Sequence, residues 1–467
     1  MILMPGAKAY DQRSDGLPPI ECENWYAERT PKQTGVDWVL VSAPGQEAFA
    51  ARTSTPQGGF AEYDVFGGDV FTIYNGEFER TDSAGVTTQI ATLTETGRAI
   101  FTSVRGSLVF CVGGNAFVYD GTALTEITDV DLPTVSRGGA GISSVTSMDG
   151  RIIFTEEGTD RLWWSGIFNP SDIDVLAFAT AETFEDRLVR AIADHRELWL
   201  FGHKTIEIWR PVANSEQPFQ RIGDMVIEKG CLSRLTIAKC DNTLFWVGQD
   251  AIVYRAEGIT PKRISNHGID RILSKLTEAE LTQLHAFSYT DEGHAFYILT
   301  VPGVKTFCYD ASTGEWHTRK SEGREDWGVT DYCEAFSSHF VLADMGVNRL
   351  SRDATSNAGS QIKRTATFNI PTYIPQPVER VAAYASSLDA AQAELDLDMS
   401  FEFTDDVGRT WSTPETVPIY QNGQHAQRVT VFRQGQIETP GRTYRLSVIS
   451  DAARVTLGPA YVNEAEH

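Results

Sequence analysis

Short apolar runs separated by tight turns recur along most of the chain. Residues 285–319 hold the clearest example, with four runs of apolar and aromatic residues divided by turns at 291–293, 302–303 and 312–314. Runs of this length, joined by Gly-, Asp- and Pro-containing turns, are typical of short strands that pair with their sequence neighbours. The segment therefore predicts a four-stranded antiparallel meander.

The same layout occurs seven times. The second strands of the copies begin near residues 70, 107, 151, 197, 243, 295 and 339, a spacing of about 36 to 52 residues. One blade of a β-propeller takes about 40–45 residues. A single sheet of this size cannot bury both faces, whereas sheets stacked in a ring can. The pattern predicts an all-β chain with a propeller of six or seven four-stranded blades over residues 61–358. A series of hairpins in stacked sandwiches is the alternative.

The pattern changes on either side of this region. Small and polar residues at 355–360 mark a boundary, and the strands predicted beyond it indicate a small C-terminal β-sandwich over residues 359–467. Residues 1–60 are interpreted as an N-terminal arm. Within this arm, residues 36–42 are the candidate for a strand that closes the propeller ring.

Helices and long loops are few. Thr277 and Glu280 have the spacing of a capping box and predict a short helix within residues 269–284. Two long stretches, 122–141 and 166–187, are predicted to be loops at the rim of the propeller. Rim loops commonly make binding contacts. They are therefore candidates for assembly contacts, together with residues 1–35.

The charge argues against a grip on nucleic acid. The 467 residues include 40 Lys and Arg against 63 Asp and Glu, a formal net charge of −23. Binding to a phosphate backbone requires the opposite sign. The excess of carboxylates serves solubility or, alternatively, a surface that repels polyanions, such as the wall of a DNA passage.

No segment indicates membrane insertion, because no apolar run approaches the ~18 residues that a membrane helix requires. The six Cys include no CxxC pair. They are expected to be buried or half-buried thiols rather than zinc ligands or a disulfide framework.

The sequence contains no recognisable catalytic or metal-binding constellation. The motifs HExxH, GxGxxG and GxSxG and the phosphate-binding P-loop are absent, and no two of the nine His are four residues apart. Adjacent carboxylates at 405–406 and 156–157 stand beside Gly in turn contexts and are interpreted as turn residues. No catalytic residue, metal site or cofactor is predicted.

Residues 404–411 match the pattern T-x-D-x-G-x-T-W. This segment resembles the Asp box of sialidase-like propellers, in which the Asp accepts backbone N–H groups and the Gly adopts a conformation that other residues avoid. Asp406, Gly408 and Trp411 are accordingly predicted to form a structural turn. The motif also supports an alternative function, a carbohydrate-binding or glycan-depolymerising tail protein. That alternative predicts a pocket with several aromatic residues and paired carboxylates about 5–10 Å apart.

Several segments together, in this order, resemble the tail-hub or nozzle proteins of short-tailed bacteriophages, also called packaged-DNA stabilisation proteins. They are residues 23–28, 162–165, 169–174, 181–182, 197–202, 205–209, 227–230, 245–248, 261–265, 304–316, 444–451 and 458–462. The resemblance covers most of the chain and rests on the order and spacing of these segments. A generic cellular interaction propeller is a further alternative, although no Trp of this chain is followed by Asp.

The resemblance implies a structural role in the virion tail and no enzymatic activity. Family members form a ring, usually of six copies, below the portal or its head–tail adaptor. The ring extends the DNA channel and retains the packaged DNA, which passes without specific binding, and a needle, plug or fibre attaches further out. Such a protein is assembled in the cytoplasm of the bacterial host.

Overall fold

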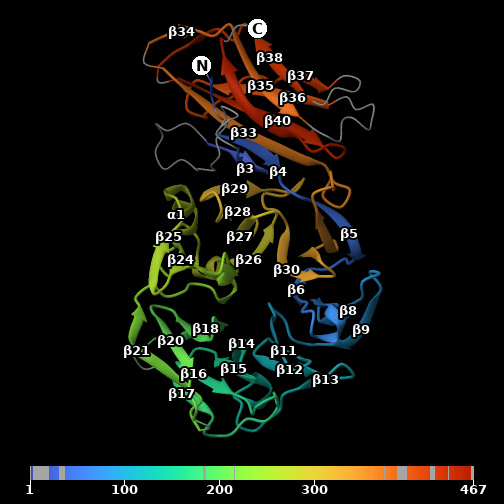
Figure 1. Cartoon of the computed structure of the whole chain (residues 1–467), viewed down its shortest axis with the longest axis vertical. Coiled ribbons are helices and arrows are strands. Elements are labelled where there is room, and N and C mark those ends of the chain that lie inside the picture. The colour runs from blue at the N-terminus through green and yellow to red at the C-terminus, as the bar shows by residue number, and fades with distance from the viewer. Residues whose placement is uncertain are drawn as a thin grey trace.

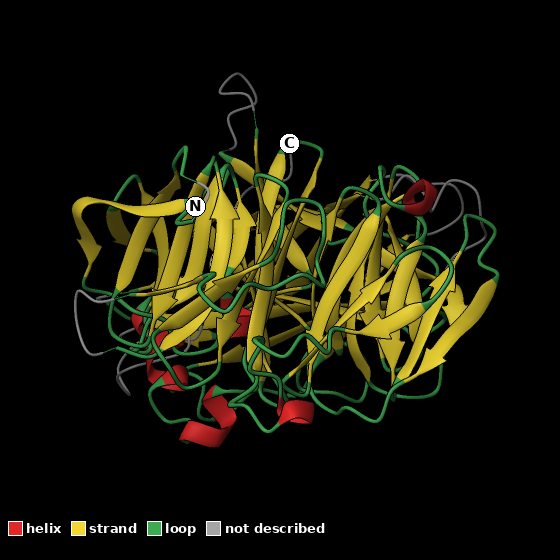
Figure 2. Ribbon diagram, turned by 90° about the horizontal axis from the view of Figure 1, so that it is seen from below, coloured by secondary structure: helices red, strands yellow, loops and turns green. Residues whose placement is uncertain are grey.

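The computed structural model describes residues 2–3, 20–30, 37–181, 186–214, 216–372, 374–386, 397–420, 426–439 and 441–463. Strands dominate these segments, and the few helical turns lie at the ends of strands (Figure 2). Seven four-stranded antiparallel units surround a common centre, and a two-sheet sandwich lies at one edge of this ring (Figure 1). No helix in the described segments is long and apolar enough to cross a membrane.

Blades 1 to 4 follow one another along the chain, each from its inner to its outer strand. Blade 1 consists of β6 (Pro56–Phe60), β7 (Val70–Tyr74), β8 (Glu77–Thr81) and β9 (Thr87–Thr92). Blade 2 consists of β10 (Ile100–Val104), β11 (Ser107–Val112), β12 (Asn115–Tyr119) and β13 (Leu124–Glu126). Blade 3 consists of β14 (Ile142–Met148), β15 (Arg151–Glu156), β16 (Arg161–Trp164) and β17 (Phe178–Thr180). Blade 4 consists of β18 (Leu188–Asp194), β19 (Glu197–Gly202), β20 (Ile206–Pro211) and β21 (Phe219–Ile227).

Blades 5 to 7 complete the ring. Blade 5 consists of β22 (Ala238–Cys240), β23 (Thr243–Val247), β24 (Val253–Glu257) and β25 (Thr260–Arg263). Blade 6 consists of β26 (His285–Asp291), β27 (His294–Val301), β28 (Lys305–Asp310) and β29 (Glu315–Arg319). Blade 7 consists of β30 (Val329–Ala335), β31 (Ser338–Ala343), β32 (Gly346–Ser351) and β5 (Gly45–Ala51).

The second strand of each blade carries the apolar run from which the propeller is predicted. They begin at residues 70, 107, 151, 197, 243, 294 and 338, each within one residue of its predicted start. These strands are apolar on both faces because each face packs against a neighbouring blade. Residues 70–74 of β7, for example, are all buried, and Phe78 of blade 1 contacts Phe110 of blade 2. The predicted all-β fold class is confirmed, and the number of blades is seven.

The strand that closes the ring was predicted in the wrong place. It is β5, which pairs with β32 in the register Gly346↔Ala51 to Ser351↔Gly45. Residues 36–42 contain the stronger apolar run. That run is β4 (Trp38–Ser42), which belongs to the sandwich. β5 has a weaker pattern because the outer strand of a blade keeps exposed positions.

The sandwich combines both ends of the chain. One sheet contains β33 (Ile362–Pro371), β40 (Gly441–Ser450), β36 (Leu397–Thr404) and β37 (Glu415–Tyr420). The other contains β3 (Trp25–Arg29), β4, β41 (Thr456–Val462), β35 (Arg380–Ser386) and β38 (Ala426–Phe432), with β1 (Ile2–Leu3) beside β41. A separate pair is formed by β34 (Gln376–Pro377) and β39 (Gln436–Ile437). The predicted N-terminal arm is thus corrected, since the described strands before residue 61 belong to the sandwich or to blades 1 and 7. The rest of this arm, at 4–19 and 31–36, lies outside the described residues.

A short strand joins the two parts. β2 (Cys22–Glu23) pairs with β29 of blade 6 on one side and with β33 of the sandwich on the other, which produces one continuous nine-stranded sheet. Asn24 follows with a φ of 56°. Its side-chain nitrogen Nδ2 donates to the backbone carbonyls of Lys320 (2.9 Å) and Lys363 (2.7 Å), one on each side of the joint.

The helical turns lie between strands. They are η2 (Phe66–Gly68), η3 (Val135–Arg137), η4 (Arg234–Thr236), α1 (His267–Leu273) and α2 (Glu278–Leu281). The predicted capping box is confirmed, because Thr277 and Glu280 each bond the other's backbone at the start of α2. These two short helices occupy the single helical region that the sequence predicted.

Candidate functional site

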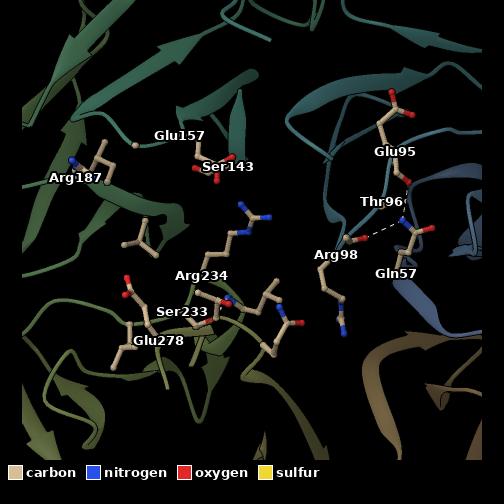
Figure 3. A pocket seen from close by; sticks show the side chains of 18 of the residues that line it. Gln57, Glu95, Thr96, Arg98, Ser143, Glu157, Arg187, Ser233, Arg234 and Glu278 are labelled. Atoms are coloured by element: carbon tan, nitrogen blue, oxygen red, sulfur yellow. Dashed lines mark hydrogen bonds between the residues drawn. The ribbon is translucent and has the colours of Figure 1, made fainter. Parts of the chain in front are cut away.

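A cavity of about 1460 Å³ opens on the face of the propeller where the inner strands begin. Turns of blades 1 to 5 and the α2 segment supply its walls. Figure 3 shows the side chains of Arg98 and Arg234 extending into this space from different walls. The lining carries charges of both signs, so the state of each charged group decides what the cavity can bind.

One wall is a hydrogen-bond network, here called the paired wall (Gln57, Glu95 and Arg98). The amide nitrogen of Gln57 donates to the carbonyls of Glu95 (3.1 Å) and Gly97 (3.0 Å), and its amide oxygen accepts from the nitrogen of Gly76 (2.6 Å). The Glu95 carboxylate accepts from the side chain of Asn115 at 3.0 Å. These bonds tie the turns of blades 1 and 2 together.

Arg98 extends the paired wall to blade 7. Its Nη2 donates to the carbonyl of Thr330 (3.0 Å) and to Oδ2 of Asp331 (3.2 Å). The same carboxylate oxygen accepts from the nitrogen of Gly59 at 3.3 Å. Arg98, just before blade 2, is thus bonded to blade 7, and Asp331 also joins blade 7 to blade 1 through Gly59.

The opposite wall is different and is here called the free wall (Arg187, Lys204 and Arg234). The nearby carboxylate of Asp186 is occupied, since it accepts from the backbone nitrogens of Lys204 and Thr205, both at 2.7 Å. Among the described residues, no carboxylate lies within ion-pair distance of the three cationic side chains. The carboxylates of Glu157 and Glu278 line the same cavity (Figure 3).

A further arginine, Arg190 of β18, lies next to the free wall. Its Nη1 donates to the backbone carbonyls of Arg234 (2.9 Å) and Ile237 (3.3 Å). Its Nε is buried and has no hydrogen-bond partner among the described groups. Burial lowers the pKa of Arg190, the carboxylate of Asp331 acts in the opposite direction, and the charge of Arg234 makes a smaller contribution that lowers it.

His285 of β26 lies beside the paired wall. Its ring nitrogens are 3.2 Å from the carbonyl of Gln283 and 3.3 Å from the carbonyl of Val329. Burial lowers the pKa of His285 to about 4, and the charge of Arg98 acts in the same direction. The imidazole is therefore neutral near pH 7, and only one of the two nitrogens can donate.

The predicted turn motif does not belong to the cavity. It connects β36 and β37 of the sandwich. The Asp406 carboxylate accepts from the nitrogen of Thr410 (2.9 Å) and from the hydroxyl of Thr404 (2.7 Å). Hydrogen bonds from Thr410 and Thr404 hold the pKa of Asp406 below its usual range. Gly408 has a φ of 90°, and its nitrogen donates to the Thr404 hydroxyl at 2.9 Å.

The other residues around this turn are also engaged. The half-buried Trp411 carries the Arg445 guanidinium 3.9 Å above its ring. Asp405 accepts two 2.6 Å bonds from Arg442. Asp405 and Asp406 thus point to different partners. Glu156, of the other adjacent pair, accepts from the indole of Trp163 at 2.9 Å, whereas Glu157 lines the cavity.

Exposed apolar side chains gather in the two long loops around blades 2 and 3. This rim patch consists of Val130 (73% exposed), Ile167 (58%), Phe168 (50%), Val175 (56%) and Leu176 (74%). Asp129 joins the loops by accepting from the nitrogen of Ile173 at 3.3 Å. The patch lies within the loops predicted at 122–141 and 166–187, of which residues 182–185 lie outside the described part.

Metal-ligating clusters and thiols are the other groups to consider. They contain no group of three or more His, Cys, Asp or Glu that could hold a metal ion. All six thiols are buried, as predicted. Burial raises the pKa of Cys111 and Cys231 to about 11 and that of Cys308 to about 12, which keeps these thiols protonated.

Sequence reasoning missed the charged residues of the cavity. Arg98, Arg187 and Arg234 belong to three blades and share no local motif. Each, however, stands one to four residues before the inner strand of its blade, at Ile100, Leu188 and Ala238 respectively. Aligning the seven repeats at their inner strands is the signal that could have grouped them.

The fold is a seven-bladed β-propeller joined to a β-sandwich. Comparison with known proteins agrees with this class. The sequence model of the family described as "Bacteriophage P22 Gp10, beta-propeller" matches residues 23–350. The chain therefore belongs to this family of phage tail proteins, the DNA-stabilisation or tail-hub proteins of short-tailed phages.

Two solved structures are similar to the chain at low sequence identity. BamB from Moraxella catarrhalis is 10% identical, with 67% of this chain and 90% of BamB covered at a TM-score of 0.40. The Pan2 WD40 domain from Neurospora crassa is 7% identical, with 64% of this chain and 90% of that domain covered at a TM-score of 0.42. No curated protein matches the sequence.

Proposed function

We propose that this protein is a non-enzymatic structural component of the tail of a short-tailed phage. In this role it assembles as a ring, six copies in the simplest arrangement, below the portal or head–tail adaptor. The ring extends the DNA channel and retains packaged DNA, and a needle, plug or fibre binds further out. The observation that carries the proposal is the family match, which spans the joint strand β2 and the blades up to β32.

The strand pairing of the chain suits a rigid structural part. The ring is closed by strand pairing between β5 and β32, which lie at opposite ends of the propeller sequence. The propeller continues into the sandwich through backbone hydrogen bonds of β2 rather than through a flexible linker. A body of this kind can transmit force between neighbours without changing shape.

The charge also supports passage of DNA. A net charge of −23 repels a polyanion over much of the surface. Binding that depends on phosphate neutralisation needs clustered Lys and Arg. A ring of such subunits would let DNA move along its axis without specific binding.

The rim patch is the surface that we assign to assembly. Five apolar side chains at 50–74% exposure lie on two loops that Asp129 joins, and exposed apolar patches mark protein–protein contacts. The patch protrudes from blades 2 and 3, on loops that the blades themselves do not need for closure. We propose that these loops contact another copy or a neighbouring tail protein in the virion.

The carbohydrate-binding alternative gains no support from the cavity. That alternative required several aromatic side chains around paired carboxylates. The described lining of the cavity contains no Trp, Tyr or Phe. The turn at Asp406, which suggested the alternative, lies on the sandwich and is engaged in local hydrogen bonds.

The test is genetic and structural. Deleting the gene in its phage should yield heads that lose their DNA and particles that lack the lower tail in electron micrographs. Complementation with the wild-type gene should restore both. Particles that keep their DNA and a complete tail without the protein would refute the proposal.

A matched pair of variants tests the rim patch. Leu176→Asp should prevent incorporation into particles, because it places a charge in the proposed contact. Met345→Asp, at a position that is 73% exposed on blade 7, is the control and should be incorporated normally. Equal incorporation of the two variants, both folded by circular dichroism, would show that the patch is not an assembly contact.

A further inference from the structure

We propose that the rim patch of one copy docks on the outer face of the sandwich of a second copy, so that successive copies join head to tail. The inference rests on the ring proposed above and names the two surfaces that form its subunit contact. Figure 1 shows the sandwich and the loops of blades 2 and 3 at opposite ends of the long axis. One copy can therefore use both surfaces at once.

The outer face of the sheet of β35, β38 and β41, here called the sandwich face, consists of Arg380, Tyr384, Arg428, Phe432 and Tyr461. In the pairing of β35 with β38, Tyr384 lies opposite Arg428, and Arg380 lies opposite Phe432. Residues directly opposite one another share a face of the sheet. The residues that alternate with them point into the sandwich core: Val381, Ala383, Val429 and Val431. The Tyr461 ring contacts the Tyr384 ring at a centroid distance of 5.6 Å, which places it on the same outer face.

The aromatic side chains of the sandwich face are accessible. Tyr384 is 43% exposed and Phe432 is 55% exposed. Phe432 also borders a surface pocket of about 720 Å³, which Val378 and Arg433 help to line. Exposed aromatic residues beside a pocket are typical anchors of protein–protein interfaces. The pocket can receive an apolar side chain such as Leu176, which is 74% exposed in the rim patch.

The sandwich face is basic, although the chain has a net charge of −23. Arg380, Arg428 and the neighbouring Arg433 have no carboxylate within ion-pair distance among the described residues. The guanidinium of Arg428 instead lies 5.6 Å from the centroid of the Tyr461 ring. Glu379 is the one carboxylate in the described lining of the pocket. A partner with apolar and acidic side chains matches this composition.

The rim patch has that complementary composition. The same two loops carry four aspartates, Asp129, Asp131, Asp172 and Asp174. None of them lies within ion-pair distance of a Lys or Arg among the described residues. Arg105, which lies 4.8 Å from the centroid of the Phe168 ring, opposes them in sign.

The two charges select the arrangement of the copies. Two rim patches facing each other would bring aspartates together, and two sandwich faces would bring arginines together, so that like charges would oppose either pairing. A rim patch on a sandwich face brings opposite charges together. A contact between two different surfaces of the same chain repeats from copy to copy and closes into a ring when the rotation permits.

Reversing the charges tests the contact. The face variant carries Arg380→Glu and Arg428→Glu, and the rim variant carries Asp172→Arg and Asp174→Arg. Each is supplied from a plasmid to a phage that lacks the gene, and its amount in purified particles is measured. We expect at least a tenfold loss for each variant alone. The two variants supplied together should be incorporated again, because the reversed face of one meets the reversed rim of the other, and their unchanged surfaces also match.

Controls separate this contact from other causes. Both variants should be folded by circular dichroism, and if the face variant is not, Arg380→Glu with Arg433→Glu replaces it. Lys262→Glu, at a side chain that is 58% exposed on blade 5, should be incorporated like the wild type. Normal incorporation of either variant alone, or no recovery when the two are combined, would overturn the head-to-tail contact and leave the role in the tail intact. Absence of the wild-type protein from particles would overturn both proposals.

Discussion

The two walls of the cavity use the same kinds of residues in opposite ways. In the paired wall, Arg98 finds Asp331 and the carbonyl of Thr330, and Gln57 satisfies three backbone groups. In the free wall, Arg187, Lys204 and Arg234 have no ion-pair partner among the described residues. The difference indicates that the first wall holds blades together and that the second remains available to a ligand.

The two walls should also differ in how much their side chains contribute to folding stability. Removing one partner of a buried polar pair leaves the other unsatisfied, at a cost of about 1–3 kcal/mol. Removing a group without a partner leaves no other group unsatisfied. Surface substitutions of this sort usually change the unfolding free energy by no more than about 0.5 kcal/mol. The stability of substituted proteins can therefore separate the two walls.

The largest loss of folding stability is expected on acidification, because it protonates His285, which lies beside the paired wall. Because the pKa of His285 is lowered to about 4 in the folded protein, the unfolded chain binds a proton below pH 6.5 that the folded chain refuses. The contribution of neutral His285 to folding stability is complete above pH 6.5 and decreases as the pH falls towards 4. His317, whose pKa is lowered to about 3 by burial, acts in the same direction.

Urea unfolding at pH 7 and pH 5 measures this effect. His285 should account for about 2 kcal/mol of the loss between these values, at about 1.4 kcal/mol per pH unit. The variant His285→Gln cannot titrate and should lose correspondingly less stability over the same range. His203→Gln, at an exposed position, is the control. If His285→Gln shows the wild-type pH dependence, His285 is not the group that titrates.

Asp331→Ala is expected to cost less stability than the combined titration of His285 and His317. The substitution leaves Arg98 without its carboxylate and the nitrogen of Gly59 without its acceptor. We expect a loss of about 2 kcal/mol from two unsatisfied groups at the contact of blades 1 and 7. Glu157→Ala, which removes a carboxylate from the same cavity, is the matched control. Equal unfolding midpoints for the two variants would remove the distinction between the walls.

The sequence predicted the features that depend on neighbours in the chain. The second strand of each blade pairs with strands on either side within about 40–45 residues, so its apolar run and flanking turns are both local signals. The capping box at Thr277 is local as well. For these elements, pattern and structure agree to within a residue or two.

Elements whose partners are distant were misplaced or missed. β5 closes the ring against β32, about three hundred residues later in the chain, and β2 joins two strands that flank it only after folding. The cavity has the same origin, since Arg98, Arg187 and Arg234 meet only when three blades take their places. No window along the sequence contains these pairings.

The smallest change in unfolding free energy is expected from Arg234→Met. This variant also tests the difference between the two walls most directly. Methionine keeps the length of the side chain and removes its charge, and no described carboxylate loses a partner. In chloride buffer the unfolding free energy should stay within about 0.5 kcal/mol of wild type. Arg98→Met, the same substitution on the paired wall, should lose about 1–3 kcal/mol in the same urea titration, because Asp331 is left without its cation. A loss of that size in Arg234→Met would mean that the free wall also holds the fold together, and the division between structural and free charges would fail.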